Sequence, residues 1–186
     1  MKHTVRKVFP NEYKKYREHL KSLDTDSRNL RFGYSVKDEG IDKLCDSIEH
    51  DTSKHILFCI EDADLKFVAV GHIALGNDSS SMELAFSVLK EFQGKGMGDM
   101  LMKRCIRYCR THNIYRGHMV CLSRNGAIRK LCTKNRLKVV TDGTDAETAI
   151  ELPLPSVRTF VKELIYNNLS LLDYMEKRYV YMLSIR

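Results

Sequence analysis

The chain has 186 residues, of which 43% are hydrophobic and 30% are charged, a balance typical of a globular domain and not of a disordered chain. The net charge of +7 favours anionic ligands, but the lysines and arginines are scattered and nothing marks a nucleic-acid-binding protein. No apolar run approaches the roughly 20 residues of a membrane span, and the N-terminus lacks a signal-peptide core, so we expect a cytoplasmic protein without a membrane anchor.

The cysteines show no spacing typical of a metal site. They stand at positions 45, 59, 105, 109, 121 and 132, without a Cys-x-x-Cys pair or the histidine spacing of a zinc site. Cys105 and Cys109 lie one helical turn apart, and Cys59 and Cys121 fall in apolar runs. We therefore expect reduced, structural thiols and no bound metal.

The N-terminal part of the chain predicts a strand and two helices. Thr4–Phe9 fits a short edge strand, and Pro10 then starts a helix with one apolar stripe, formed by Tyr13, Tyr16, Leu20 and Leu23. The segment Asp26–Gly33 fits a loop or half-turn with two arginines and an aromatic residue. Ser35-x-x-Asp38 is typical of a capping box before a second helix, whose apolar residues are Ile41, Leu44, Cys45 and Ile48.

The pattern then changes to strands. His55–Glu61 is densely apolar, Asp62–Asp64 is a polar turn, and Leu65–Leu75 is a second apolar run. A third strand is expected over Met82–Leu89. Consecutive strands joined by short turns form an antiparallel meander, which a doubly wound nucleotide-binding fold would not contain.

Three alternating glycines follow the third strand. The sequence Gln93-Gly94-Lys95-Gly96-Met97-Gly98 opens an amphipathic helix. Glycine permits a tight turn there, and the unpaired N–H groups of a helix N-terminus attract anions, so the segment predicts a seat for a pyrophosphate. The Gly-Lys-Ser/Thr triple of a P-loop is absent, and the Gly-x-Gly-x-x-Gly spacing of a Rossmann fingerprint is not met.

The remaining segments predict the rest of a sheet. The helix after the glycines has an apolar face and a charged face, and Asp99 falls on the charged one. Arg116–Leu122 is another apolar strand, and Asn125–Asn135 is a second helix. A closing hairpin is expected from a strand over Leu137–Thr141, a turn at Asp142-Gly143 and a strand over Thr148–Leu152.

The last segment, Ser156–Arg186, predicts a helix of another kind. Its apolar residues alternate at spacings of four and three, a heptad-like seam of Val157, Val161, Leu164, Asn168, Leu171 and Met175. The seam would pack either on the protein's own sheet or on a partner helix in a homodimer. We therefore divide the chain into a domain over residues 1–155 and a helical extension over residues 156–186.

Three motifs, taken with the order of the elements, resemble the GNAT superfamily of N-acetyltransferases over about residues 4–152. Gln93–Gly98 matches the Gln-x-x-Gly-x-Gly signature for acyl-coenzyme A, Glu83 lies ten residues before Gln93, and Ser123–Leu131 resembles the family's Asn-x-x-Met/Ala-x-x-Leu helix. Ser27–Phe32 resembles the Arg-Phe segment of the branch that includes bacterial protein-lysine acetyltransferases. The resemblance implies an α+β fold, with a mostly antiparallel sheet of six to seven strands flanked by helices and an added C-terminal helix.

The same resemblance implies an acetyl-CoA-dependent N-acetyltransferase that moves the acetyl group directly to a primary amine. In the resembled branch, a glutamate at the position of Glu83 acts as the general base that removes a proton from the amine. Glutamate is depleted in strands, which favours this role over an ordinary surface position. The alternative is a non-catalytic sensor or interaction module that keeps the fold and binds acyl-CoA.

The resemblance also assigns the contacts to acetyl-CoA. The pantetheine arm would pair with the strand backbone after Glu83, the pyrophosphate would take N–H groups of the glycine loop, and the asparagine of the second helix would contact the cofactor. The cofactor-binding candidates are Phe86, Ser87, Val88, Gln93, Gly94, Lys95, Gly96, Met97, Gly98 and Asn125.

The acceptor and the acid for the departing thiolate stay open. The acceptor would be an amine on a small molecule or a protein lysine, and Arg28 and Arg31 are expected to line its pocket. Many members of the family carry a tyrosine as general acid where this chain has Cys132. A thiol could protonate the thiolate, but a core cysteine is the simpler interpretation.

Overall fold

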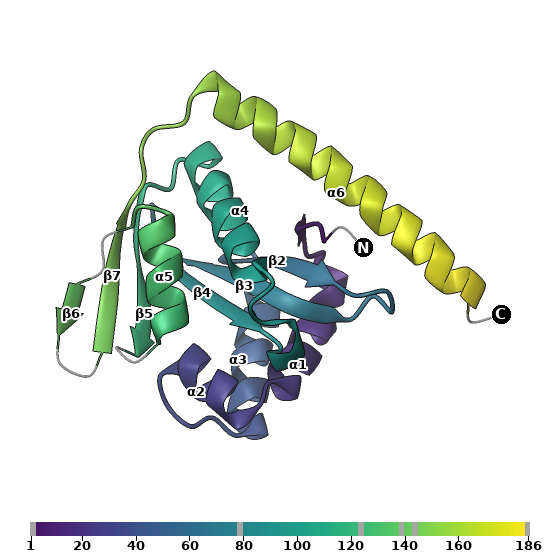
Figure 1. Ribbon diagram of the computed structural model, residues 1–186, viewed down its shortest axis with the longest axis horizontal. Helices are drawn as coiled ribbons and strands as arrows, with labels where there is room; N and C mark the ends of the chain where they lie inside the picture. Colours follow the sequence, from purple (N-terminus) through teal and green to yellow (C-terminus); the bar gives the residue numbers. More distant parts are fainter. Residues whose placement is uncertain (1–2, 78–79, 123–124, 138–139, 143–144, 185–186) are drawn as a thin grey trace.

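The computed structural model describes residues 3–77, 80–122, 125–137, 140–142 and 145–184, and it contains a seven-stranded sheet ordered β1-β2-β3-β4-β5-β7-β6 (Figure 1). β4 and β5 run parallel, and every other neighbouring pair is antiparallel. The predicted α+β fold with a mostly antiparallel sheet is confirmed. The strands are β1 (Arg6–Lys7), β2 (His55–Glu61), β3 (Phe67–Leu75), β4 (Ser81–Val88), β5 (Arg116–Leu122), β6 (Val140–Asp142) and β7 (Asp145–Glu151).

Helices cover both faces of this sheet (Figure 1). Those described are α1 (Tyr13–Ser22), α2 (Thr25–Phe32), α3 (Asp38–His50), α4 (Met97–Thr111), α5 (Gly126–Lys134) and α6 (Val157–Ser184). α1 and α3 pack on one face, while α4 and α5 pack on the other. α2 lies beside β4 and β5, and α6 runs along the outside next to α4 and β1.

An apolar core lies on each side of the sheet. In one core, α1 and α3 bury their predicted stripes against β2 and β3, and Tyr16, Leu20 and Ile41 are almost completely buried. In the other, the apolar face of α4 packs together with Ile128 and Cys132 of α5. The predicted apolar faces of these helices are therefore confirmed.

The described cysteines are core residues. Cys45, Cys59, Cys105, Cys109 and Cys132 are all buried, and burial raises the pKa of the Cys45 thiol to about 11. Within the described residues, no cluster of histidine, cysteine and acidic side chains has the geometry to hold a metal ion. No helix in that part of the chain is long and apolar enough to span a bilayer.

The segment Asp26–Gly33, predicted as a loop or half-turn, lies mostly in α2. The carboxylate of Asp24 accepts the N–H groups of Asp26 and Ser27, each at 3.1 Å, and so caps the start of the helix. Gly33 ends it at a φ of 81°, a left-handed conformation that glycine adopts readily. The prediction was wrong because the polar residues that suggested a loop form the helix cap.

Three other predicted boundaries need correction. α3 begins at Asp38, after Lys37, without a side-chain cap, so Ser35 does not form the predicted capping box. The N-terminal strand covers only Arg6–Lys7 instead of Thr4–Phe9. In the closing hairpin the second strand begins earlier than predicted, as β7.

Parts of two predicted motifs lie outside the described residues. They are Ser123 and Arg124, at the start of the asparagine motif, and Gly143 of the predicted hairpin turn. Asn125 and the helix that follows it are described.

β4 and β5 pair only over a short distance. Their register joins three pairs of residues, Ser81 with Arg116, Met82 with Gly117 and Glu83 with His118. The close approach requires glycine at position 117, because a Cβ there would lie 2.2 Å from the carbonyl oxygen of Met82. Beyond Glu83, β4 continues along β3 alone, so β4 and β5 separate and leave the β4 backbone open where the pantetheine arm was expected.

α6 runs along the outside of the domain (Figure 1), and polar residues form the face that it turns inward. The buried Arg104 of α4 donates to Glu163 and to Asn167, and the guanidinium of Arg6 lies 4.0 Å from the ring centroid of Tyr174. Ion pairing and cation–π contact thus anchor the helix. Its buried residues are Thr159, Glu163, Ser170 and Lys177.

The predicted heptad seam of α6 faces away from the domain. Val157 is 81% exposed, Leu164 66% and Met175 58%. Packing of this seam on the protein's own sheet, the first of the two alternatives, is therefore wrong. A helix of 28 residues is left with an open apolar side.

Candidate active site

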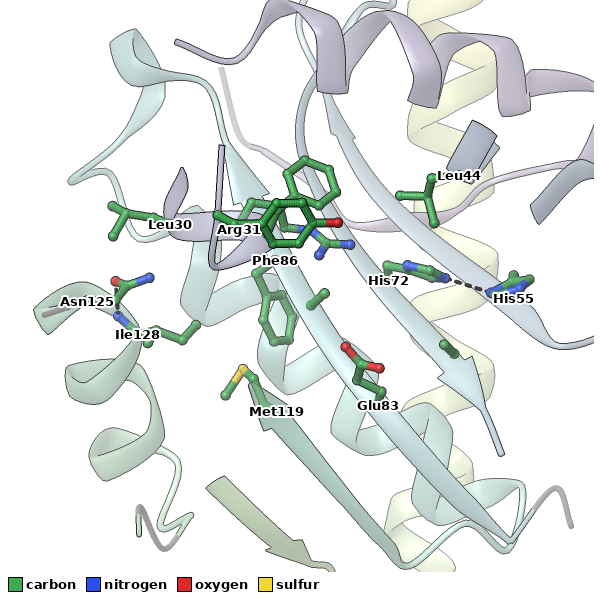
Figure 2. A pocket seen from close by; sticks show the side chains of 14 residues that line it. Leu30, Arg31, Leu44, His55, His72, Glu83, Phe86, Met119, Asn125 and Ile128 are labelled. Carbon is green, nitrogen blue, oxygen red and sulfur yellow. Dashed lines mark hydrogen bonds between the residues drawn. The ribbon is translucent and has the colours of Figure 1, made fainter. Parts of the chain in front are cut away.

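Two adjoining cavities open where β4 separates from β5. The glycine-loop cleft runs along Gly94, Gly96 and Gly98 to α5. The Glu83 cavity is lined among others by Arg31, Tyr34, His55, His72, Glu83 and Met119 (Figure 2). The two form one groove, because both are lined by Leu30, Phe86, Asn125 and Ile128.

The glycine loop leaves room for a ligand at the start of α4. Gly94 and Gly96 have φ angles of 74° and 80°, and nothing lies within 4 Å of the place where a Cβ would stand on either. At this end of α4 the N–H of Met100 donates to the carbonyl of Gly96 at 3.1 Å. The N–H groups before it have no acceptor within the helix and suit a pyrophosphate.

Gln93 and Lys95 flank this cradle in different ways. The Gln93 Nε2 donates to Ser27 Oγ and to the carbonyl of Val88, each at 3.1 Å, and so ties the loop to α2 and β4. The Lys95 Nζ lies 5.1 Å from the ring centroid of Phe92. Gln93 therefore positions the loop, while Lys95 adds a positive charge at its rim.

Met97 and Gly98 line the cleft through their backbone. The Met97 side chain is 1% exposed, so only its main chain can reach a ligand. A Cβ on Gly98 would lie 2.9 Å from Leu131 Cδ1. Glycine at this position lets α5 pack closely over the start of α4.

The buried carboxylate of Asp99 holds α5 against the start of α4. Asp99, predicted on the charged solvent face, is 8% exposed, and its carboxylate lies 2.7 Å from Lys103 Nζ and 2.9 Å from Lys134 Nζ. It also accepts from Asn135 at 3.1 Å. Burial alone would raise its pKa, but these donors lower the pKa of Asp99 to about 2, so the carboxylate stays charged.

The Ser87 side chain is engaged inside the protein. The Nδ1 of the buried His19 lies 2.8 Å from the carbonyl of Phe67, and its Nε2 lies 2.8 Å from Ser87 Oγ. A carbonyl only accepts, so Nδ1 donates and Nε2 accepts the Ser87 hydroxyl. Burial lowers the pKa of His19 to about 4, which keeps the ring neutral near pH 7. Ser87 can therefore meet a ligand only through its backbone.

Asn125 marks the junction of the two cavities. Its Oδ1 accepts the N–H of Ile128 at 3.2 Å, so the side chain caps α5. The cap holds the first turn of α5 against the groove, where Asn125 lines both cavities.

Glu83 is the last residue of β4 that pairs with β5, and its carboxylate points into the cavity (Figure 2). The side chain is 49% exposed, and its carboxylate lies 3.9 Å from His118 Nε2 on β5, too far for a hydrogen bond. The carboxylate is open to a molecule in the cavity. The sequence did not reveal His118, because its place opposite Glu83 depends on the register of two distant strands.

The two arginines of α2 have different surroundings. Arg28 donates to the carbonyls of Lys21 and Leu23 and pairs with Asp38 at 2.7 Å, and it lines neither cavity. Arg31, one turn later, lines the Glu83 cavity. Only Arg31 is placed to meet an acceptor there.

Comparison with known proteins decides the family. The model of the acetyltransferase (GNAT) family matches residues 18–134, well over half of the chain. The chain belongs to the GNAT family of acetyltransferases. The prediction of an acyltransferase of this family is confirmed, and α6 lies outside the matched region.

Three proteins that this GNAT acetyltransferase resembles share less than a quarter of its aligned residues. Acetyltransferase PA5475 of Pseudomonas aeruginosa is 23% identical over 131 residues, which cover 69% of this chain and 70% of the relative. The GNAT domain of S. lividans PAT superposes with a TM-score of 0.65 at 16% identity, over 80% of this chain and 89% of that one. Spermidine N-acetyltransferase from Vibrio cholerae, solved with CoA and spermine, superposes with a TM-score of 0.59 at 17% identity. The match covers 79% of this chain and 93% of that one.

Cys132 does not take part in the site of this GNAT protein. Its side chain is 0% exposed within the core between α4, α5 and the sheet, and it lines neither cavity. Of the site residues that the sequence left unnoticed, His19 alone had a local signal, because it lies beside Leu20 in the apolar stripe of α1. Strand pairing alone brings His55 next to His72, and it alone places His118 opposite Glu83.

Proposed function

We propose that this GNAT protein transfers an acetyl group from acetyl-CoA directly to a primary amine, with Glu83 as the general base. One observation carries the proposal. The carboxylate of Glu83 lies in the part of the groove that adjoins the glycine-loop cleft, at the point where β4 leaves β5. A similar structure, the spermidine N-acetyltransferase of Vibrio cholerae, holds CoA and spermine, which supports a donor and an amine acceptor in this groove.

Different parts of the groove would bind different parts of acetyl-CoA. The loop Gln93–Gly98 offers backbone N–H groups to the pyrophosphate, and the unpaired edge of β4 at Phe86–Val88 offers backbone groups to the pantetheine arm. The thioester of acetyl-CoA supplies the acetyl group. Asn125 stands where the two parts of the groove meet, so it is placed beside the reacting end of the donor.

Glu83 makes the acceptor nucleophilic. It takes one proton from the ammonium group of the acceptor, and the nitrogen lone pair then attacks the carbonyl carbon of the thioester. The C–N bond forms as the C–S bond breaks. The nitrogen loses two protons in total, of which one ends on the sulfur of CoA and one in solvent. Because Cys132 is buried away from the groove, it does not deliver this proton, which passes from the nitrogen to the sulfur through water.

The direct test is acetyl transfer by the purified chain. Release of the CoA thiol should depend on an added primary amine, and mass spectrometry should find the amine acetylated. The comparisons do not single out the protein-lysine branch, so the panel includes a lysine peptide as well as small amines. Acetyl-CoA binding without transfer to any amine would favour the non-catalytic sensor instead. The cytoplasmic location stays a prediction from sequence.

We further infer that the exposed seam of α6 pairs with the same seam on a second copy. The seam has Val161, Asn168 and Met175 at a positions and Val157, Leu164 and Leu171 at d positions, so Asn168 stands near its centre. Valine and one asparagine at a positions with leucine at d positions favour two parallel strands, because the two asparagines hydrogen-bond to each other. A polar amide at the middle of the face would be unfavourable in a lipid bilayer, which argues for a protein partner.

Sedimentation velocity should therefore find twice the chain mass of 21.6 kDa for the wild type. Replacing Leu164 and Leu171 together with glutamate should give a folded monomer, since both are exposed and their loss leaves the domain core intact. Lys162→Glu, also on the exposed side of α6 but outside the seam, is the matched control and should remain dimeric. A monomeric wild type at tens of micromolar would rule the dimer out.

A further inference from the structure

The guanidinium of Arg31 points into the Glu83 cavity without an acidic partner (Figure 2). It donates to the Tyr16 hydroxyl at 3.4 Å and lies 5.0 Å from the ring centroid of Phe32. Among the side chains that the structure describes, no carboxylate lies within ion-pair distance of it. Tyr16 and Phe32 therefore support the group and leave its charge uncompensated.

Two other arginines on the helices of this side of the sheet are paired with carboxylates of the protein itself. Arg17 pairs with Asp42, Asp46 and Glu49, and Arg28, on the same helix as Arg31, pairs with Asp38. A guanidinium is permanently charged and has a planar fork that suits a carboxylate. An arginine left unpaired in a cavity indicates that the anion it matches comes from the ligand.

The remaining polar groups of the cavity do not supply that anion. The Nε2 of His72 lies 3.0 Å from the Nδ1 of His55, and burial, helped by the charge of Arg31 at His72, lowers the pKa of both rings, so they are neutral near pH 7. Glu83 is the one carboxylate among the described lining residues. Apart from Asn125 and the hydroxyl of Tyr34, which carry no charge, the rest of the wall is apolar or aromatic and includes Leu30, Phe32, Leu44, Phe86, Met119 and Ile128.

We propose that the acceptor is an amine that also carries a carboxylate, on an apolar or aromatic frame, as in a hydrophobic amino acid. The carboxylate would bind Arg31, the amine would face Glu83, and the frame would lie against the apolar wall. The proposal rests on the function proposed above and narrows its acceptor. A polyamine fits poorly, because its several positive charges would meet one carboxylate and a like charge at Arg31.

Three probes that differ only at the carboxylate test this acceptor class. They are L-phenylalanine, its amide, in which the charge is removed, and 2-phenylethylamine, in which the group is absent. Spermidine serves as the polycationic comparison. We expect kcat/KM for phenylalanine to exceed that of the other three by about tenfold or more, which is the size of one charged hydrogen bond.

Variants of the two arginines on α2 locate the effect. Arg31→Gln should raise KM for phenylalanine about 10- to 100-fold with little change in kcat. It should not raise KM for 2-phenylethylamine, which has no carboxylate for the guanidinium to bind and loses a like charge from the cavity. Arg31→Lys should recover part of the loss, because it keeps the charge without the planar fork. Arg28→Gln removes a guanidinium that lines neither cavity and is the matched control.

Calorimetric binding of phenylalanine to the protein with CoA separates this proposal from the one it rests on. Transfer to all four amines without preference for the carboxylate would overturn the acceptor class and leave acetyl transfer standing. Phenylalanine binding that depends on Arg31, without any transfer, would support the class and overturn the enzyme. If neither transfer to phenylalanine nor its binding depends on Arg31, the role of Arg31 is overturned. Equal losses of phenylalanine binding in Arg28→Gln and Arg31→Gln would overturn it as well.

Discussion

Replacing Glu83 with glutamine is expected to lower kcat by about 10²- to 10⁴-fold at neutral pH, the usual contribution of a general base. Glutamine keeps the size and shape of the side chain but cannot accept the proton of an ammonium group. Acetyl-CoA should bind the variant as it binds the wild type, since Glu83 does not line the glycine-loop cleft. Steady-state kinetics and a binding titration on the same preparation measure both quantities.

The pH profile and a neighbouring variant separate a base from a structural residue. Activity of the Glu83→Gln variant should rise towards high pH, where the amine loses its proton without help. His118→Gln removes the group that lies 3.9 Å from the Glu83 carboxylate, and should change kcat little. If the two variants lose activity equally, with flat profiles, Glu83 acts by pairing β4 with β5 and not as the base.

The sequence was a good guide where the structure depends on neighbours in the chain. β2 and β5 have the predicted bounds, because dense apolar runs between polar turns define a strand locally. The glycine loop at the start of α4 was also predictable, since it depends on the backbone of one strand–helix junction. Asn125 was expected only to contact the cofactor, and its role as the cap of α5 comes from the structure. The resemblance to GNAT proteins rested on these same local motifs.

Features that depend on contacts between distant segments were not predictable. Asp99 looked like a surface residue of α4, but α5 packs over it and supplies Lys134 and Asn135 as partners. The difference between Arg28 and Arg31 depends on α3, which brings Asp38 to only one of them. A single sequence shows which side chains can form ion pairs, and the fold decides which of them remain for a ligand.

The orientation of α6 also depends on contacts with a distant segment. Its apolar periodicity predicts a helix with a seam, but periodicity does not say which face meets the domain. The buried Arg104 settles that question by drawing Glu163 and Asn167 inward. One charged residue on a neighbouring helix thereby turned the apolar face to the outside.

Binding of acetyl-CoA at the glycine loop is expected to stabilise the folded protein. Wild-type protein at a hundredfold excess of acetyl-CoA over its Kd should gain about 2.7 kcal/mol of stability, which raises Tm by about 5–10 °C for a chain of this size. Gly96→Val should lose this gain almost completely. The new side chain would project into the open cradle, and a branched residue at a φ of 80° would also reshape the loop.

Gly33→Val provides a control that is matched to this change. Gly33 has a φ of 81° against 80° at Gly96, and a Cβ at either position would have nothing within 4 Å. Both variants therefore carry a similar backbone penalty, about 1–2 kcal/mol, and should melt earlier than the wild type without ligand. Only Gly96→Val should stop responding to acetyl-CoA, because Gly33 does not line the glycine-loop cleft. An equal response in both variants would mean that the pyrophosphate binds elsewhere, and the open space at Gly96 would then reflect only the geometry of a helix start.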